Sequence, residues 1–379
     1  MIRAAWSTLT LLSVALTAQT AVDPEEFVHL EAVLQRAMRI AAPFVVTVET
    51  FGGTRKVLAD NDSAGSAPPN RVGAKPRAMK DPGFHQAQGR SAGIVLSKDG
   101  WIMVARFALN YDPTSILVTV QGGKTFHADR KGEDTSRGIA LLKIDAIDLV
   151  TAELVLPNDV RVGQWAFAIG RTFGGLEPTV HLGIVSALRR QFGRALQIDA
   201  YTSPANYGGA VVDITGRVLG IAVPLSPTGR DAGVEWYDSG IGFAATLADI
   251  PELIERMKRG ENIHRGWLGV EFEQSHLGPG AKLSGTPKDG VAAQAGLRKG
   301  DVILEIDGIL VKNGAHLQML LGARMGGEAV GMKVRQKTMV NDPIAVTVIL
   351  ADTSDAQREQ SKEAELPASF PLPEKQEGR

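Results

Sequence analysis

Short apolar runs separated by glycine-containing turns fill the chain between residues 92 and 244. Two of these runs, 92–96 and 101–105, are joined by Lys-Asp-Gly at 98–100, a hairpin signal because Asp-Gly readily takes the positive φ angles of a tight turn. No amphipathic helical pattern interrupts the series. Runs of this length and spacing predict an antiparallel β fold, either closed into a barrel or packed as a sandwich.

Helical patterns flank this region. The spacing of apolar residues predicts a helix over 31–42, which Pro43 ends, and a second over 246–258, with Thr246 as its cap and Gly260 after its last turn. A third helix is expected over 315–325. The other runs that we expect to be strands are 44–50, 115–120, 123–128, 139–144, 160–169, 179–189, 195–200, 237–244 and 344–350.

The segment 197–224 places two β-type runs on either side of a tight polar turn at Asn206-Tyr207-Gly208-Gly209. Paired glycines after a protruding side chain let the backbone turn sharply and leave amides free to face a ligand. We therefore expect this turn to carry any chemistry of the domain.

Composition excludes several classes of site. The 379 residues include no cysteine, which removes thiol chemistry, disulfides and cysteine-ligated metals. The 41 basic and 42 acidic residues nearly cancel, so no overall charge favours nucleic acid. The histidines show no metal-ligand spacing and no glycine-rich phosphate loop is present, so we expect neither metal nor cofactor.

The two ends of the chain and one internal segment lack the strand pattern of the rest. Residues 1–21 combine Arg3, an apolar centre and small residues, as a secretory signal does, and no later run is long enough to cross a bilayer. This predicts a periplasmic or secreted protein without an integral membrane span in its mature part. Residues 52–90 are predicted to form a flexible loop, and residues 352–379 a disordered tail.

The turn resembles the nucleophile turn of trypsin-like proteases of the HtrA/DegP family. Those proteases read Gly-Asn-Ser-Gly-Gly where this chain reads Ala-Asn-Tyr-Gly-Gly at 205–209. The resemblance implies a mostly β protein in which residues 22–259 form a trypsin-like double β-barrel. The family's histidine and aspartate correspond to Phe107 in VARFA and Gly138 before IALLK, and its serine corresponds to Tyr207.

Acyl transfer by such a triad needs a hydroxyl nucleophile, a base to take its proton and a carboxylate to orient the base. Phe107 and Gly138 can supply neither of the last two, and Tyr207 has an ordinary pKa of about 10 and a longer reach than serine. Only backbone donors of an oxyanion hole could persist, in the loop of Ala205, Asn206 and Gly208. A relocated triad would have to draw on other residues: Ser203 or Ser136, His127 or His181, and Asp134 or Asp199.

Residues 264–351 resemble a PDZ domain, an α+β module, through GWLGV at 266–270 and the motifs AGL at 295–297 and GDVI at 300–303. The resemblance implies that backbone amides around the first motif receive a peptide's terminal carboxylate, while the strand from Val270 pairs with the peptide. The residues expected to bind peptide are Gly266, Trp267, Leu268, Gly269, Val270, Leu317, Leu320 and Leu321.

Together these features predict an exported HtrA-like pseudoprotease that binds unfolded or C-terminal peptides in a chaperone-like or regulatory role. Active HtrA-type proteases and further copies of the chain are the other expected partners. The alternative is an active HtrA-type serine endopeptidase of protein quality control, which the family resemblance alone suggests.

Overall fold

The computed structural model describes residues 24–52, 89–110, 112–171, 177–225, 237–287, 290–337 and 343–352. The predicted signal stretch lies outside these residues. So do the predicted loop and tail, apart from their end residues.

A first closed barrel has the strand order β1-β2-β3-β6-β5-β4, and every neighbouring pair is antiparallel. The hairpin predicted at 98–100 joins β2 to β3, although only its glycine has a positive φ. The strands are β1 (Val45–Phe51), β2 (Gly89–Val95), β3 (Trp101–Ala105), β4 (Ser115–Thr119), β5 (Thr125–Asp134) and β6 (Ile139–Ile144).

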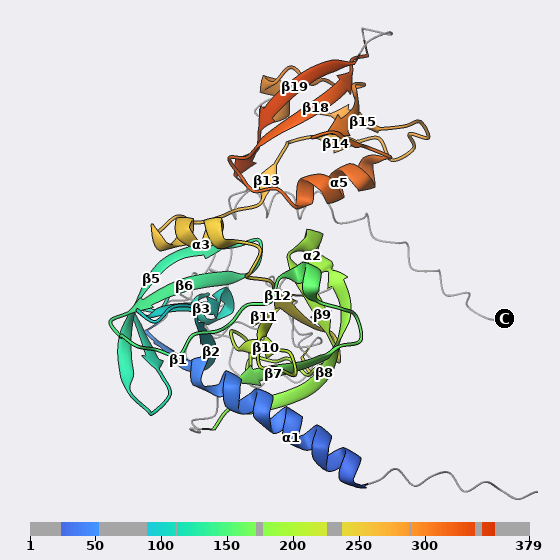
Figure 1. The fold of residues 1–379 in the computed structure, drawn as a ribbon. Helices are drawn as coiled ribbons and strands as arrows, with labels where there is room; N and C mark the ends of the chain where they lie inside the picture. The colour runs from blue at the N-terminus through green and yellow to red at the C-terminus, as the bar shows by residue number, and fades with distance from the viewer. Residues whose placement is uncertain are drawn as a thin grey trace, which may run out of the picture.

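A second closed barrel follows in the order β10-β11-β12-β9-β8-β7 (Figure 1). Its interior is filled mainly by alanine, valine and leucine side chains, including Ala166, Val185 and Leu196. The predicted antiparallel β fold is thus confirmed, and of the two forms that the pattern allowed it is the closed barrel. The strands are β7 (Trp165–Gly170), β8 (Thr179–Arg189), β9 (Ala195–Ile198), β10 (Ala210–Val212), β11 (Val218–Val223) and β12 (Gly242–Ala245).

The larger hydrophobic core fills the first barrel and continues to the outer face of the second. Phe167 of β7 alternates with alanines that point into its own barrel, so its ring turns outward to join this shared core. Tyr207, only 2% exposed, belongs to the same core. The turn at 206–209 therefore lies where the two barrels meet.

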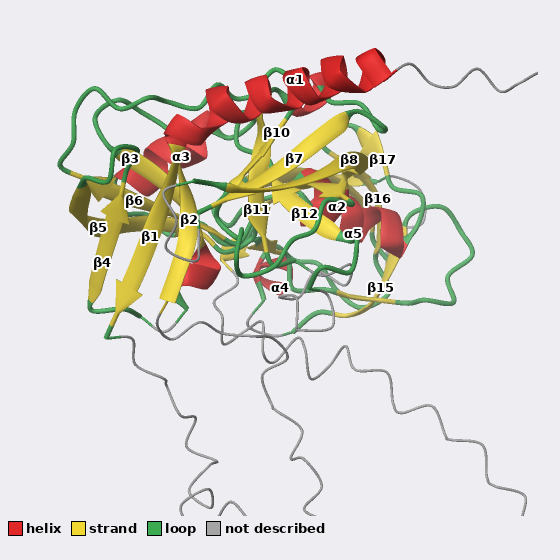
Figure 2. Ribbon diagram, turned by 90° about the horizontal axis from the view of Figure 1, so that it is seen from below, coloured by secondary structure: helices red, strands yellow, loops and turns green. Residues whose placement is uncertain are grey.

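Two helices border the barrels. The helix α1 (Pro24–Ala41) begins seven residues before the predicted start, and it lies against β10 and runs past it (Figure 2). The helix α3 (Pro251–Lys258) is shorter than predicted. Thr246 does not cap it, because its hydroxyl donates to the carbonyl of Arg194 and the helix starts at Pro251. The short helical turns are η1 (Ala42–Phe44), η3 (Arg106–Leu109), η4 (Pro157–Asp159) and α2 (Arg190–Gly193).

The third unit is a PDZ-like sheet with the order β14-β15-β16-β18-β19, a separate β13-β20 pair and two helices. The helix α5 (Gly314–Gly322) is capped by Asn313 and ends before the predicted residue 325. The other elements are β13 (Gly266–Trp267), β14 (Glu271–Phe272), β15 (Ala281–Gly285), α4 (Val291–Gln294), β16 (Val302–Ile306), β17 (Ile309–Leu310), β18 (Ala329–Arg335), β19 (Ile344–Ile349) and β20 (Ala351–Asp352).

The PDZ-like unit is docked on the second barrel through the turn after β8. Phe192 projects from α2 so closely to α5 that a Cβ atom added to Gly322 would lie 2.2 Å from its ring. The guanidinium of Arg265 lies 4.4 Å from the centre of the same ring. Figure 1 shows α2 facing α5 across this junction.

Candidate functional site

The turn before β10 is held by its own backbone and by Asn206, which is fully buried. The Asn206 side chain accepts a hydrogen bond from the amide of Ser203 at 2.9 Å and donates to the carbonyl of Tyr201 at 2.8 Å. The backbone amides of Asn206 and Tyr207 both donate to the carbonyl of Ser203, and that of Gly208 donates to Ala222. These three amides are therefore engaged within the protein in this arrangement.

The glycine that follows Tyr207 permits a close approach between the barrels. Gly208 has a φ of +84°, and a Cβ atom there would lie 2.0 Å from the carbonyl oxygen of Ala92 in β2. The amide of Ala92 in turn donates to the carbonyl of Tyr207 at 3.2 Å. Any side chain at position 208 would separate the two barrels at this point.

Tyr207 lies in an aromatic cluster. Its ring meets Phe107 edge to face with centroids 5.5 Å apart, and meets Tyr237 in the same way at 6.0 Å. Phe107 is 3% exposed and stands on η3, directly after β3. Burial raises the pKa of the Tyr207 hydroxyl well above its usual value, and the negative charges of ionised Tyr237 and Asp238 add to this effect.

Gly138 joins the same region through the backbone. Its φ is +70°, and its carbonyl accepts a hydrogen bond from the amide of Arg106 at 2.8 Å. The Arg106 side chain forms an ion pair at 3.2 Å with Glu133, which Arg130 also contacts at 2.7 Å. The structure thus brings Phe107 and Tyr207 into contact and joins Gly138 to Arg106, the residue before Phe107, whereas a Cβ atom added to Gly138 would have no atom within 4 Å.

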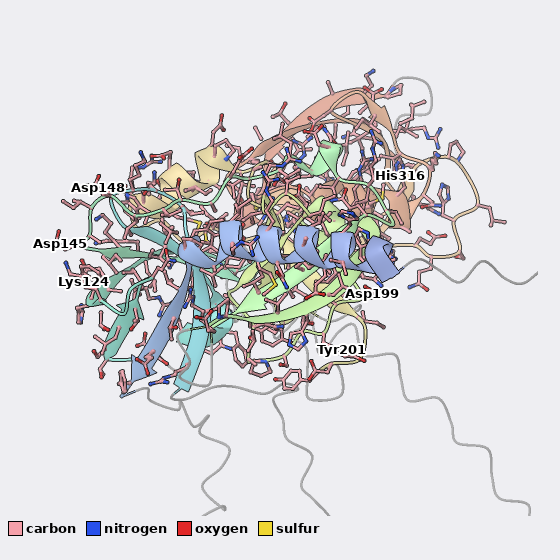
Figure 3. All side chains as sticks on the ribbon, turned by 60° about the horizontal axis from the view of Figure 1, so that its bottom comes forward. Lys124, Asp145, Asp148, Asp199, Tyr201 and His316 are labelled. Atoms are coloured by element: carbon pink, nitrogen blue, oxygen red, sulfur yellow. The ribbon has the colours of Figure 1, made fainter. Side chains whose placement is uncertain are left out.

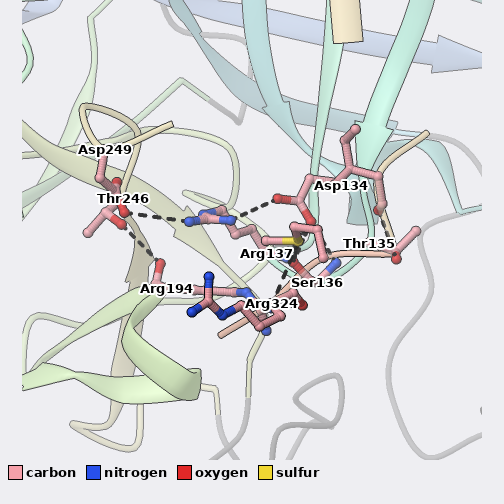
Figure 4. Close-up of polar contacts among 10 residues, drawn as sticks. Asp134, Thr135, Ser136, Arg137, Arg194, Thr246, Asp249 and Arg324 are labelled. Carbon is pink, nitrogen blue, oxygen red and sulfur yellow. Dashed lines mark hydrogen bonds and ion pairs between the residues drawn. The ribbon is translucent and has the colours of Figure 1, made fainter. Parts of the chain in front are cut away.

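The turn that precedes Gly138 is an ionic cluster at the junction with the PDZ-like unit (Figure 4). Asp134 is fully buried and accepts hydrogen bonds from the amide and hydroxyl of Ser136 and from the Arg137 guanidinium at 3.1 Å. Arg137 also reaches Asp249 at 3.5 Å. The sulfur of Met325 lies 3.9 Å from the hydroxyl of Ser136.

The candidates for a relocated triad do not meet. Ser136 donates to Asp134 rather than to a histidine, His127 is exposed on β5, and the ring of His181 lies edge-on to Tyr201. Asp199, seen beside Tyr201 in Figure 3, accepts from the backbone amide of Ile184. A hydroxyl and a histidine ring do pair elsewhere in the described ranges, where the hydroxyl of Thr135 lies 3.1 Å from Nδ1 of His264.

The residues predicted to bind peptide fall into two groups. Leu268, Leu317 and Leu321 are buried in the PDZ-like core, whereas Val270 and Leu320 are only partly buried at its surface. Gly269 has a φ of +69° and lies under the Trp267 ring, and Gly266 begins β13. The sequence prediction omitted Phe272 of β14, whose side chain would lie 3.3 Å from a Cβ atom added to Gly314 of α5. Strand alternation from Val270 could have indicated this residue.

Comparisons with known proteins place this geometry in a family. A trypsin-like peptidase domain matches residues 91–221, and a PDZ domain matches residues 287–336. A probable periplasmic serine endoprotease DegP-like from Pseudomonas fulva is 30% identical over 344 residues, covering 83% of this chain and 70% of the relative. The chain belongs to the DegP-like serine endoprotease family. A relative of the same name from Halomonas elongata is 32% identical over 291 residues, and the chain spans 59% of its length.

Solved structures agree with this assignment to the DegP-like family. The HtrA-type protease AlgW with decapeptide has a TM-score of 0.62 and 27% identity, with 85% of this chain and 99% of that chain covered. The serine endoprotease from Yersinia pestis has a TM-score of 0.59 and 26% identity, with 85% and 98% covered. The predicted trypsin-like double barrel followed by a PDZ domain is therefore confirmed.

The names of the relatives also bear on location. They are described as periplasmic, and this DegP-like chain is accordingly periplasmic or secreted. None of the helices in the described ranges is long and apolar enough to cross a membrane. The described residues also contain no group of three or more His, Asp or Glu side chains able to hold a metal ion.

Proposed function

We propose that this DegP-like protein is a pseudoprotease that binds unfolded or C-terminal peptides through its PDZ domain, as a chaperone-like holder or as a regulatory partner of active relatives. The observation that carries the proposal is the contact between Phe107 and Tyr207. Two buried aromatic rings occupy the positions at which acyl transfer needs a base and a nucleophile.

The environment of Tyr207 supports the loss of hydrolysis. A phenol whose pKa is raised by burial is a weaker source of a nucleophilic oxyanion than even a free tyrosine. Phe107 has no atom that accepts its proton. The amide of Tyr207, one of the two that an oxyanion hole at this turn would use, donates to the carbonyl of Ser203, which removes this donor from the hole.

The PDZ domain keeps the parts that peptide capture needs. The strand β14 is at one end of its sheet, and no described strand pairs with its outer side. Val270 and Leu320 are partly buried beside the core, where an apolar terminal side chain could pack between them. The AlgW structure that this chain resembles contains a decapeptide, which adds support from a relative.

The names of the relatives favour the alternative, an active serine endopeptidase. The two proposals differ in one measurement: cleavage of unfolded casein by the purified chain, together with labelling by a fluorophosphonate probe. An active DegP-like relative and its nucleophile-to-alanine variant provide positive and negative controls. The pseudoprotease proposal predicts casein turnover and labelling equal to those of the inactivated relative. Stoichiometric labelling of a serine in this chain would establish the endopeptidase instead.

A further inference from the structure

The backbone of the strand β14 shows which of its groups are available to a peptide. The amide of Glu273 donates to the carbonyl of Lys282 in β15 at 2.9 Å. The register with β15 shifts between Glu271 and Phe272, and the extra residue of this bulge is on β15. The hydrogen-bonding direction therefore still alternates along β14, and the N–H and C=O groups of Val270 and Phe272 point toward its outer side. A peptide added there would form its hydrogen bonds with these two residues.

This pairing fixes the register of the peptide. If its terminal carboxylate lies on the amides at 268–270, its last residue lies opposite Val270. In an antiparallel pair the penultimate residue then lies opposite Glu271, and the third from the end lies opposite Phe272. The pair at Glu271 is of the type without hydrogen bonds, in which facing side chains lie closest together.

The carboxylate of Glu271 is exposed next to this position. Its neighbour on β15 is Gly285, which has no side chain, and the carboxylate lies over that glycine. Among the described residues, no cation lies within ion-pair distance of Glu271. Glu273, the next residue on the same face, differs because Lys282 holds it at 2.9 Å and lowers its pKa by a hydrogen bond.

We propose that the PDZ groove selects peptides with lysine or arginine immediately before an apolar terminal residue, and that Glu271 is the specificity-determining residue. This inference rests on the peptide-binding function proposed above. A cation at the penultimate position would face Glu271 across the new strand pair, whereas an acidic residue would place two like charges opposite each other.

The test uses the full chain and three free-acid hexapeptides that differ only in the penultimate residue and end in Lys-Leu, Ala-Leu or Glu-Leu. Titration calorimetry at low salt should give Kd values that rise in that order, each step about two- to fivefold, as expected for one exposed cross-strand ion pair. The difference between the lysine and glutamate peptides should shrink as salt increases.

Two variants identify the residue responsible. Glu271→Gln should remove the preference, and Glu271→Lys should reverse it so that the glutamate peptide binds tightest. Glu273→Gln is the matched control, because that carboxylate is already paired with Lys282, and it should keep the order of the three peptides. Circular dichroism checks that each variant is folded.

The outcomes separate this inference from the function on which it rests. If all three peptides bind equally to the unmodified chain, or if Glu271→Lys keeps the original order, the role of Glu271 is wrong while peptide binding stands. If none of the free-acid peptides binds, the proposed function fails and the specificity fails with it.

Discussion

The ring of Phe107 meets the ring of Tyr207 edge to face, with centroids 5.5 Å apart and an angle of 70° between the rings. Phe107 follows β3 of the first barrel and Tyr207 precedes β10 of the second. Both side chains belong to the hydrophobic core that the barrels share. Under the proposed correspondence with the family's triad, two positions that would exchange a proton in an acyl-transfer enzyme form an apolar contact between the two barrels.

Replacing Tyr207 by serine should therefore destabilise the protein rather than activate it. Removing a large buried aromatic ring typically costs about 3–5 kcal/mol, because the surrounding core closes the cavity only in part. We expect Tyr207→Ser to lower the free energy of unfolding by an amount of this order, measured by urea denaturation. Tyr207→Phe, which keeps the ring, is the control and should cost about 1 kcal/mol or less. Equal stability of Tyr207→Ser and the unmodified chain would show that this ring contributes nothing to the core.

The same burial predicts a loss of stability at high pH. The folded protein raises the pKa of Tyr207 above the unfolded value of about 10, so its folded state holds the proton more tightly. This contribution is fully present below pH 10 and is lost as the pH rises above it. Between pH 8 and pH 11 the unmodified chain should lose more stability than Tyr207→Phe, which has no hydroxyl to ionise. Parallel stability curves for the two proteins would contradict this.

Local patterns in the sequence predicted most of the fold, because short apolar runs and the glycines of turns mark the strands and their ends. The strands 139–144 and 179–189 have the bounds that the pattern indicated. The helix expected from Thr246 begins at Pro251 instead, because the threonine hydroxyl is taken by the carbonyl of Arg194, some fifty residues earlier in the chain. A pattern read over about a dozen residues cannot indicate a hydrogen-bond partner that distant in the sequence.

The site was predictable only where a motif lies in one stretch. The position of Tyr207 follows from the glycines after it, but its contact with Tyr237 joins segments that no local pattern connects. In the PDZ domain, a helical or strand spacing could not separate Leu317, which is fully buried, from Leu320, which is partly exposed. Apolar residues that line the groove and apolar residues that fill the core recur with the same spacing in the sequence.

The contact between Phe192 and Gly322 predicts that this ring contributes to the docking of the PDZ domain, in addition to the contacts that Ser136 and Arg194 make with Met325. Phe192→Ala removes the group that lies against α5 and leaves Arg265 without its aromatic partner. We expect faster amide hydrogen exchange in the connection 259–265, with exchange inside the barrels unchanged. Arg189→Gly is the matched control in the same turn: it relieves a φ of +55° at an exposed residue, keeps the contact, and should leave that exchange as it is. Unchanged exchange in Phe192→Ala would mean that other contacts hold the domain.

Peptide binding should depend on a free terminal carboxylate and on Leu320. A chain end needs amide donors for its charge, which the backbone at 268–270 can supply, so amidating an apolar-ended peptide should weaken its binding at least tenfold in titration calorimetry. Burying an apolar terminal side chain contributes about 1.5–3 kcal/mol, and Leu320→Ser should lose part of this, about tenfold in Kd.

The choice of Leu320 for this test follows from its burial. Leu268→Glu would place a charge at a position that is 3% exposed and would unfold the domain, so its loss of binding would carry no information about the groove. Leu310→Ser is the control, since Leu310 is 72% exposed on β17 and should be neutral for binding. Equal affinity for the acid and amide forms of one peptide would show that the loop at 266–270 is only a structural turn. An unchanged peptide affinity in Leu320→Ser would show that the terminal side chain of the peptide does not bind in the groove between β14 and α5. It would not contradict carboxylate binding by the loop.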